Sequence, residues 1–349
     1  ANSTYLAGRD VPRFGMGCWA IGGPFSMNGS PAGWGETDDA ESKATIEASW
    51  DAGVRVFDTA QAYGTGHSET LLGKVLGDRK DAFIVSKFGH ELDGANRVLL
   101  PAKLDADYIT SSIEASRQRL QRDTVDLMLL HINALELSEA SRVFDTLDGL
   151  VERGLIAHYG WSTDFPDSVD AMADRENFVA IQHAMNVFLD VPTINEGAAR
   201  AELVQMIRSP LAMGLLTGKF TAGSQIDGKD VRTQDANWQG YFDKGVPAQK
   251  LLTQLAALRE MLMSDGRSLT QGALCWLLAK GPNILPVPGA RTPQQASENA
   301  GALEFDPLPE SVMAEIETIL ERPKEFVHGR SGDDVLEERK SYLRAREAS

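Results

Sequence analysis

Short apolar runs alternate with amphipathic segments along most of the chain. Eight of the apolar runs have the length and composition of buried strands: Phe14–Ala20, Val54–Thr59, Phe83–Phe88, Leu127–His131, Ala157–Ser162, Ala180–Asn186, Val204–Ser209 and Ile284–Gly289. The segments between and after them space their apolar residues as helices do, over Asp39–Ala52, Ser68–Leu76, Ala106–Leu120, Ser138–Arg153, Pro166–Asp174, Ile194–Ala201, Leu269–Ala279 and Pro293–Leu303. This alternation favours a parallel sheet over separate domains.

Eight strands with intervening helices predict an α/β chain folded as a (β/α)8 TIM barrel rather than as a doubly wound sheet. A doubly wound dinucleotide-binding domain would carry G-x-G-x-x-G after its first strand. Here the first strand leads into GMGCWAIGG, which lacks a third glycine at that spacing. We interpret these glycines as turns at the barrel mouth. Ser68 is expected to be the N-cap of its helix and Gly77 its end.

Two long segments break the alternation and are expected to be loops at the active site. Gly22–Thr37 is rich in glycine and proline and contains Trp34, and Thr221–Pro247 is polar and contains Trp238 and Tyr241. Loops of this length without regular structure usually act as lids or binding loops.

The remainder of the chain predicts a single domain with an appendage. Pro247–Ser264 has the pattern of an extra helix, and the sequence after Pro323 is strongly charged. We therefore expect one barrel domain over 1–322 and a charged C-terminal tail over 323–349, in which Val335–Arg346 could form a surface helix. Whether the tail folds back over the active site through His328 and Arg330, contacts another subunit or stays disordered is left open.

The charge balance excludes several classes of partner. The chain has 34 basic and 50 acidic residues, a net charge of −16, within a composition that is 42% hydrophobic. Nucleic acid and anionic membranes need a positive surface, so neither is an expected partner. No apolar run reaches the roughly 18 residues of a membrane span, and the first residues lack a signal-peptide pattern. A small-molecule substrate is expected, and assembly into a homo-oligomer is left open.

The cysteine and histidine content indicates a reduced, metal-free protein. The two cysteines, Cys18 and Cys275, are too few for a disulfide framework or a zinc ribbon. No cluster has the ligand spacing of a zinc or iron site, so no metal is expected. A cytoplasmic location follows as the expectation.

Three of the predicted strands end on ionisable side chains of different kinds. The runs VRVFD, FIVSK and LMLLH end on Asp58, Lys87 and His131, and Tyr63 follows five residues after Asp58. Taken singly, each has an ordinary interpretation: a turn-forming acid, a solvated lysine, a structural histidine and a packing tyrosine. Together they indicate the C-terminal rim of a barrel, where loops gather catalytic residues. An acid, a phenol, an amine and an imidazole at one rim can transfer a proton to or from a carbonyl group.

At this point the chain resembles the aldo-keto reductase superfamily, in its bacterial family-11-like branch. The segments that carry the resemblance are VFDTAQAYGTGHSETLLGKVL, IVSKFG, DLMLLHIN, GWSTDF, SPLAMGLLTGKF and PVPGARTPQQASENAGAL. They follow the family order and span roughly residues 14–305. The resemblance implies a barrel that binds an extended nicotinamide dinucleotide, NADP(H), without a Rossmann domain.

The resemblance also implies a catalytic tetrad of Asp58, Tyr63, Lys87 and His131. Tyr63 would donate a proton during reduction and accept one during oxidation. The ammonium of Lys87 would lower the pKa of that phenol. Asp58 would keep Lys87 charged, and His131 would orient the substrate oxygen.

The residues expected around the nicotinamide come from the later strand ends. Ser162, Thr163 and Gln182 match positions that hydrogen-bond the carboxamide, although the family usually has Ser-Asn where this chain has Ser162-Thr163. Arg208 stands where many members stack an aromatic ring, and its guanidinium can stack instead. Trp19 would be a wall of the site. From the residues alone, Gln182 could equally be a buried amide, Arg208 a surface residue and Trp19 a packing plug.

The rest of the dinucleotide would follow two later segments. The positions implied for the pyrophosphate are Ser209, Leu211, Gly214 and Lys219, and those for the adenosine end are Gly289, Arg291, Gln295, Glu298 and Asn299. Arg291 is the candidate for the 2′-phosphate, which favours NADP(H) over NAD(H). Gln295 stands where many members have an arginine.

The expected activity is hydride transfer between NADP(H) and the carbonyl group of an aldehyde, ketone or sugar. A sugar substrate would place the chain in carbohydrate metabolism. The sequence also resembles an oxidoreductase of bacterial sulfosugar breakdown, which implies reduction of a 6-oxo-glucose to glucose. The alternative is a regulatory subunit of the same fold, which binds the nucleotide and a membrane channel with little turnover. The tetrad does not decide between them, because such subunits keep it.

Overall fold

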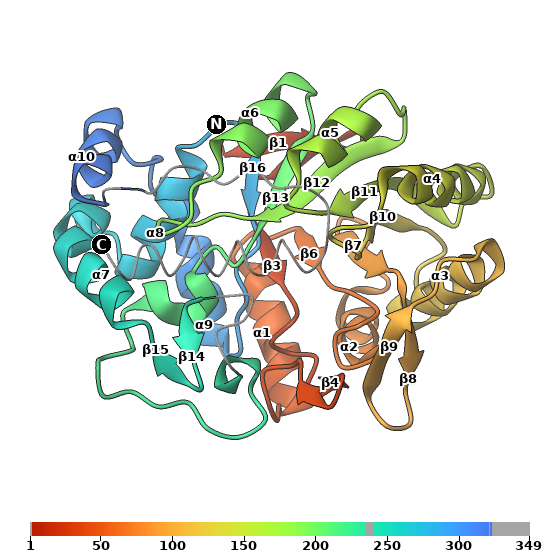
Figure 1. The fold of residues 1–349 in the computed structure, drawn as a ribbon, viewed down its shortest axis with the longest axis horizontal. Coiled ribbons are helices and arrows are strands. Elements are labelled where there is room, and N and C mark those ends of the chain that lie inside the picture. Colours follow the sequence, from red (N-terminus) through yellow and green to blue (C-terminus); the bar gives the residue numbers. More distant parts are fainter. Residues whose placement is uncertain (1, 235–239, 321, 323–349) are drawn as a thin grey trace.

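The computed structural model describes residues 2–234, 240–320 and 322. Eight parallel strands form its centre, and they are paired in sequence order (Figure 1). These strands are β3 (Gly15–Gly17), β6 (Val56–Asp58), β7 (Phe83–Phe88), β10 (Val125–Leu130), β11 (Ile156–Ser162), β12 (Phe178–Ala184), β13 (Val204–Arg208) and β16 (Ile284–Pro286). A parallel bridge between Gly17 and Gly289 joins the first strand to the end of the last. The predicted (β/α)8 barrel is confirmed.

Helices surround the strands, and each lies within a few residues of its predicted position. They are α1 (Asp39–Asp51), α2 (His67–Leu76), α3 (Ala106–Leu120), α4 (Leu137–Glu152), α5 (Pro166–Met172), α6 (Pro192–Arg200), α8 (Leu269–Leu278) and α9 (Pro293–Ala300). The expected extra helix is α7 (Gln249–Leu262), and α10 (Glu310–Leu320), which the sequence did not predict, packs against it. Short 3-10 turns lie at Ala212–Thr217 (η1), Val231–Thr233 (η2), Ser264–Gly266 (η3) and Gly301–Glu304 (η4).

The expectation for the start of α2 is wrong. Its N-cap is Gly66, and Ser68 lies inside the helix with its side chain buried. The Ser68 hydroxyl donates to the Cys18 carbonyl oxygen at 2.9 Å and contacts the Thr59 hydroxyl at 2.7 Å. It therefore ties α2 to the ends of β3 and β6 rather than capping the helix. The helix ends at Gly77 as expected.

An N-terminal hairpin that the sequence did not predict packs at the end of the barrel where the strands begin. It consists of β1 (Ser3–Leu6) and β2 (Arg9–Pro12). Leu6 and Val11 pack in one cluster with Val56 and Phe83, the first residues of β6 and β7. The hairpin therefore packs at the end of the barrel where the strands begin, opposite to the strand ends that carry Asp58, Lys87 and His131.

Both segments expected to be irregular contain short strands. The first holds β4 (Ser26–Met27) and β5 (Ser30–Pro31), which join β9 (Val98–Ala102) and β8 (His90–Asp93) in one small sheet. The second holds β14 (Phe242–Asp243) and β15 (Val246–Pro247). Asn28 and Gly29 turn the first hairpin with φ of 52° and 77°, as a tight two-residue turn requires. The Asn-Gly pair was a local signal that the expectation of irregular structure overlooked.

The tail over 323–349, with His328, Arg330 and the helix expected at Val335–Arg346, lies outside the described residues, as does Trp238. The division into one barrel domain and a tail therefore stays a prediction. Within the part of the chain that the structure describes, no helix has the length and apolar composition needed to cross a membrane.

Candidate active site

The alternation of side chains along each strand places the candidate residues in one layer. Val56, Val85, Leu129, Ala180 and Met206 form the apolar interior of the barrel. Side chains two residues apart on a strand point to the same face. The residue two positions beyond each of these is Asp58, Lys87, His131, Gln182 and Arg208 in turn. The sequence thus builds a polar layer directly above the apolar core.

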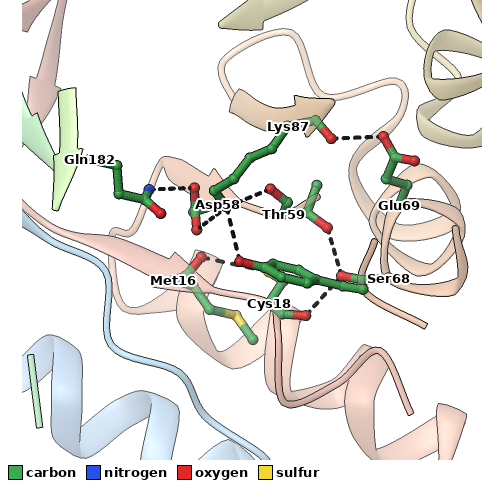
Figure 2. A network of polar contacts seen from close by, with 10 residues as sticks. Met16, Cys18, Asp58, Thr59, Ser68, Glu69, Lys87 and Gln182 are labelled. Atoms are coloured by element: carbon green, nitrogen blue, oxygen red, sulfur yellow. Dashed lines mark hydrogen bonds and ion pairs between the residues drawn. The ribbon is translucent and has the colours of Figure 1, made fainter. Parts of the chain in front are cut away.

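Three residues of the expected tetrad are in direct contact. The Lys87 Nζ lies 3.0 Å from Asp58 Oδ2 and donates to the Tyr63 hydroxyl oxygen at 3.1 Å. It also donates to the Thr59 carbonyl oxygen at 2.8 Å, so backbone and side chains together direct the ammonium. Figure 2 shows Asp58 between Lys87 and Gln182, whose Nε2 donates to Asp58 Oδ1 at 2.9 Å. The Lys87 side chain is 0% exposed and that of Asp58 is 5% exposed.

The loop after β6 holds Tyr63 against its neighbours. Gly64 has a φ of 62°, and a Cβ there would lie 1.9 Å from the Gly22 carbonyl oxygen. Two loops can approach this closely only with glycine at that point. Trp19 stacks on Tyr63 with ring centroids 6.2 Å apart, and His131 meets Tyr63 edge-on at 6.1 Å. The fourth tetrad residue therefore stands beside the phenol.

Burial controls the acidity of this cluster. Burial raises the pKa of the Tyr63 phenol, and the opposing effect of Lys87 does not offset it. Lys87 lowers the pKa of Tyr63 as expected, but burial outweighs it and Asp58 opposes it, so the phenol as a whole is not the acidic one that the sequence led us to expect. Burial also pulls the pKa of Lys87 down, but Asp58 and Tyr63 outweigh it and the net direction is upward. Burial and then Lys87 bring the pKa of His131 well below its ordinary value.

At neutral pH the site thus holds a protonated phenol, a charged lysine and a neutral imidazole. The phenol can give a proton to a developing alkoxide. The neutral imidazole can donate one hydrogen bond without carrying a charge. This combination suits reduction of a carbonyl group.

A cavity of about 970 Å³ opens above the tetrad. Asp58, Tyr63 and His131 line it, whereas Lys87 lies behind Tyr63. Nearly all the residues expected to bind cofactor also line it, namely Trp19, Ser162, Gln182, Arg208, Ser209, Leu211, Gly214, Lys219, Gly289, Arg291, Gln295, Glu298 and Asn299. Residues from seven distant segments are therefore brought to one space.

Thr163 is the exception among the expected cofactor residues. Its side chain is buried outside the cavity lining. The hydroxyl donates to the Asn133 carbonyl oxygen at 2.9 Å and accepts from the Phe165 amide at 3.3 Å. Because its hydroxyl bonds within the loop and lies outside the cavity, the Thr163 side chain is not placed to contact a nicotinamide carboxamide.

Another part of the cavity lining, which we call the loop end, is rich in cations, among them Lys219, Arg232 and Arg291. Arg291 donates to the carbonyl oxygens of Trp34 at 3.1 Å and Glu36 at 2.9 Å, and its backbone amide donates to Gln295 Oε1 at 2.8 Å. Lys219 lies nearby: burial lowers its pKa, and the charges of Arg232 and Arg291 lower it further. Within a chain of net charge −16, this local cluster of cations favours an anionic ligand.

Sequence reasoning missed Arg232 and Asn133, which also line the cavity. Arg232 forms a two-point ion pair with Asp230, at 3.0 and 2.8 Å, and its guanidinium lies 4.3 Å from the Trp34 ring centroid. The Val231 amide donates to the Gly33 carbonyl oxygen at 2.7 Å. The two active-site loops therefore meet across the cavity. Only the D-x-R spacing hinted at this, and such spacing is common on any surface.

Comparison with known proteins adds a separate line of support. The family model described as "Aldo/keto reductase family" matches residues 14–321. The chain belongs to this family. This aldo-keto reductase is 30% identical to the Bacillus subtilis aldo-keto reductase YhdN, and the match covers 82% of this chain and 84% of that protein. It is 27% identical to the Schizosaccharomyces pombe aldo-keto reductase yakc [NADP(+)], with 84% of each chain covered.

Among solved structures, the glycerol dehydrogenase AKR11B4 from Gluconobacter oxydans superposes with a TM-score of 0.76. The two chains are 26% identical, with 94% of this chain and 99% of that one covered. This similarity confirms that the chain resembles family-11 aldo-keto reductases.

Proposed function

We propose that this aldo-keto reductase transfers hydride from NADPH to the carbonyl group of an aldehyde, ketone or sugar, with Tyr63 as the proton donor. The observation that carries the proposal is the contact between the Tyr63 hydroxyl and the buried Lys87 Nζ, at 3.1 Å, beneath a large cavity. A bound nicotinamide would supply the hydride. The chain's own residues supply the proton and the electrostatic stabilisation.

Each tetrad residue has a distinct role in this proposal. The substrate oxygen would accept hydrogen bonds from the Tyr63 hydroxyl and the neutral His131 ring. As negative charge develops on that oxygen, Tyr63 transfers its proton and Lys87 stabilises the resulting phenolate. Asp58 keeps the buried Lys87 charged.

The cofactor is proposed from the charges that line the cavity. Lys219 and Arg291 fit the phosphates, and Ser162, Gln182 and Arg208 fit the nicotinamide end. The Gln182 amide already donates one N–H to Asp58, which leaves it a second N–H and a carbonyl oxygen for the carboxamide. Arg291 would bind the 2′-phosphate, so we propose NADP(H) rather than NAD(H). The NADP(+) in the name of the yeast relative supports this choice.

In its finer form the proposal names a sugar aldehyde, 6-oxo-glucose, which is reduced to glucose. Trp19 and Trp34 line the cavity with their rings edge-on, 5.2 Å apart. Flat aromatic faces can pack against the apolar face of a pyranose ring. Asn133 offers a polar group for its hydroxyls.

The test is NADPH oxidation, followed spectrophotometrically, over a panel of simple aldehydes, ketones, monosaccharides and 6-oxo-glucose. We expect turnover with NADPH and the highest kcat/KM for the sugar aldehyde. A preference for simple aldehydes would leave the reductase activity standing and overturn the sugar. Binding of NADPH without turnover on every compound would instead support a regulatory subunit.

A further inference from the structure

One carboxylate outside the tetrad joins four successive strand ends. Asp164 follows β11, and its Oδ1 accepts from the Ala184 amide, at the end of β12, at 3.0 Å. Its Oδ2 accepts from Asn133 Nδ2, just after β10, at 2.8 Å and from Arg208 Nη2, at the end of β13. The Asp164 amide in turn donates to Asn133 Oδ1 at 2.8 Å. Asn133 and Arg208 both line the cavity, whereas Asp164 lies behind them.

The ion pair differs in exposure at its two ends. The Asp164 side chain is 4% exposed and that of Arg208 is 28% exposed. A buried carboxylate with several donors has a fixed position, and its contact with Arg208 Nη2 anchors that end of the guanidinium. Arg208 therefore reaches the cavity from an anchored position that its own flexible stem would not provide.

The charge of Arg208 also reaches the catalytic groups. Around Tyr63, the charged or titratable groups come from β6 (Asp58), β7 (Lys87), the end of β10 (His131) and β13 (Arg208). Burial dominates the pKa of Tyr63, Lys87 opposes it, and Arg208 lowers it by a smaller amount. Asp164 balances a cation that stands close to the reacting groups.

We propose that Asp164 is a positioning residue that anchors the Arg208 guanidinium at the nicotinamide site. The assignment rests on the proposed function, because it takes the ligand beside Arg208 to be the nicotinamide end of NADPH. Asp164 touches neither cofactor nor substrate and acts through Arg208. Asp164 also bonds Asn133 and so would hold that side chain in place where it lines the cavity.

A double-mutant cycle tests this role by NADPH affinity rather than by turnover. The dissociation constant is measured from the quenching of protein fluorescence in Asp164→Asn, Arg208→Ala and the double variant. Asp164→Asn keeps the shape and an acceptor for the Ala184 amide but loses the charge that holds Arg208. We expect about tenfold weaker NADPH binding in the wild-type background and less than about twofold in the Arg208→Ala background, as for residues that act as one unit.

Controls separate positioning from general support of the fold. Asp145→Asn removes an exposed carboxylate that pairs with Arg175, and it should leave NADPH affinity unchanged. Thermal unfolding of each variant shows whether the fold is kept, and Asp164→Glu, which keeps the charge, should recover part of the affinity. Should Asp164→Asn fail to fold, the Glu variant with and without Arg208→Ala carries the same comparison.

The outcomes are distinct. An equal loss of affinity in both backgrounds, or no loss in the wild-type background, would overturn the positioning role while the proposed function stands. A wild-type protein that does not bind NADPH would refute the proposed function itself, and the assignment of Asp164 with it.

Discussion

The two ends of the cavity handle charge in opposite ways. At the tetrad end, Lys87 is sealed from solvent and faces Asp58 at 3.0 Å. At the other end, Lys219 and Arg291 are gathered by loops, and the two arginines there lower the pKa of Lys219, whose burial lowers it first. Strand ends build the first site, and the loops around Trp34 and Arg232 build the second. The pairing of Lys87 with Asp58 suits proton transfer by a neighbouring phenol. The grouping of Lys219 with Arg291 suits the binding of an anion.

The largest effect should come from the phenol itself. Tyr63→Phe removes the proton donor and keeps the ring that packs on Trp19. We expect kcat for carbonyl reduction to fall by about 10²–10⁴-fold, with NADPH affinity unchanged. Tyr5→Phe, at an exposed tyrosine, is the matched control. Near-original turnover in Tyr63→Phe would remove the basis of the proposed mechanism.

The lysine should matter for both stability and rate. Lys87→Met leaves Asp58 buried without its cation, which should lower the free energy of unfolding by about 3–5 kcal/mol. Denaturant unfolding measures this loss. Adding Asp58→Asn should recover most of the stability but none of the activity. If the double variant were as unstable as the single one, the pair would not be the source of the loss.

The loop end should respond in affinity alone. Arg291→Ala should weaken NADPH binding about tenfold, as expected for loss of one charge-assisted contact, and leave NADH binding and kcat almost unchanged. Dissociation constants for both nucleotides provide the measurement, and Arg153→Ala, at an exposed arginine, is the control. An unchanged NADPH/NADH preference would contradict the assignment of the 2′-phosphate.

The smallest effect should be that of pH within the neutral range. Burial raises the pKa of Tyr63, so the phenol stays protonated until the pH exceeds the ordinary tyrosine value of about 10. Burial brings the pKa of His131 well below its ordinary value, so the imidazole stays neutral down to mildly acidic pH. We therefore expect kcat/KM for reduction to be flat between pH of about 6 and 9. A basic limb near neutrality would show that the phenol is more acidic than its burial allows.

Three of the four tetrad residues could be predicted from the sequence because strand periodicity is a local feature. Period-two alternation fixes which strand residues face the interior, so Asp58, Lys87 and His131 follow directly from the apolar residues before them. Tyr63 needed the family resemblance as well, because a loop residue has no such periodicity. Gln182 and Arg208 also came from the family resemblance, which did not indicate the bond between Gln182 and Asp58.

The loop end could be predicted only in part. Arg232 reaches the cavity through contacts between two loops that are distant in sequence, and no local pattern encodes that meeting. Thr163 was misplaced because a hydroxyl one residue past a strand can turn to either side, and here its own loop satisfies it. The short strands on either side of Asn28 were not predicted. Their Asn-Gly turn signal was present in the sequence, but the glycine and proline around it favoured an irregular loop.

The hairpin of β1 and β2 has a practical consequence. Leu6 and Val11 pack with the first residues of β6 and β7, so the amino-terminal hairpin lies at the end of the barrel opposite to the cavity. A support or fusion partner linked at the amino-terminal end would therefore be attached on the side of the molecule away from the cavity and would leave its opening accessible.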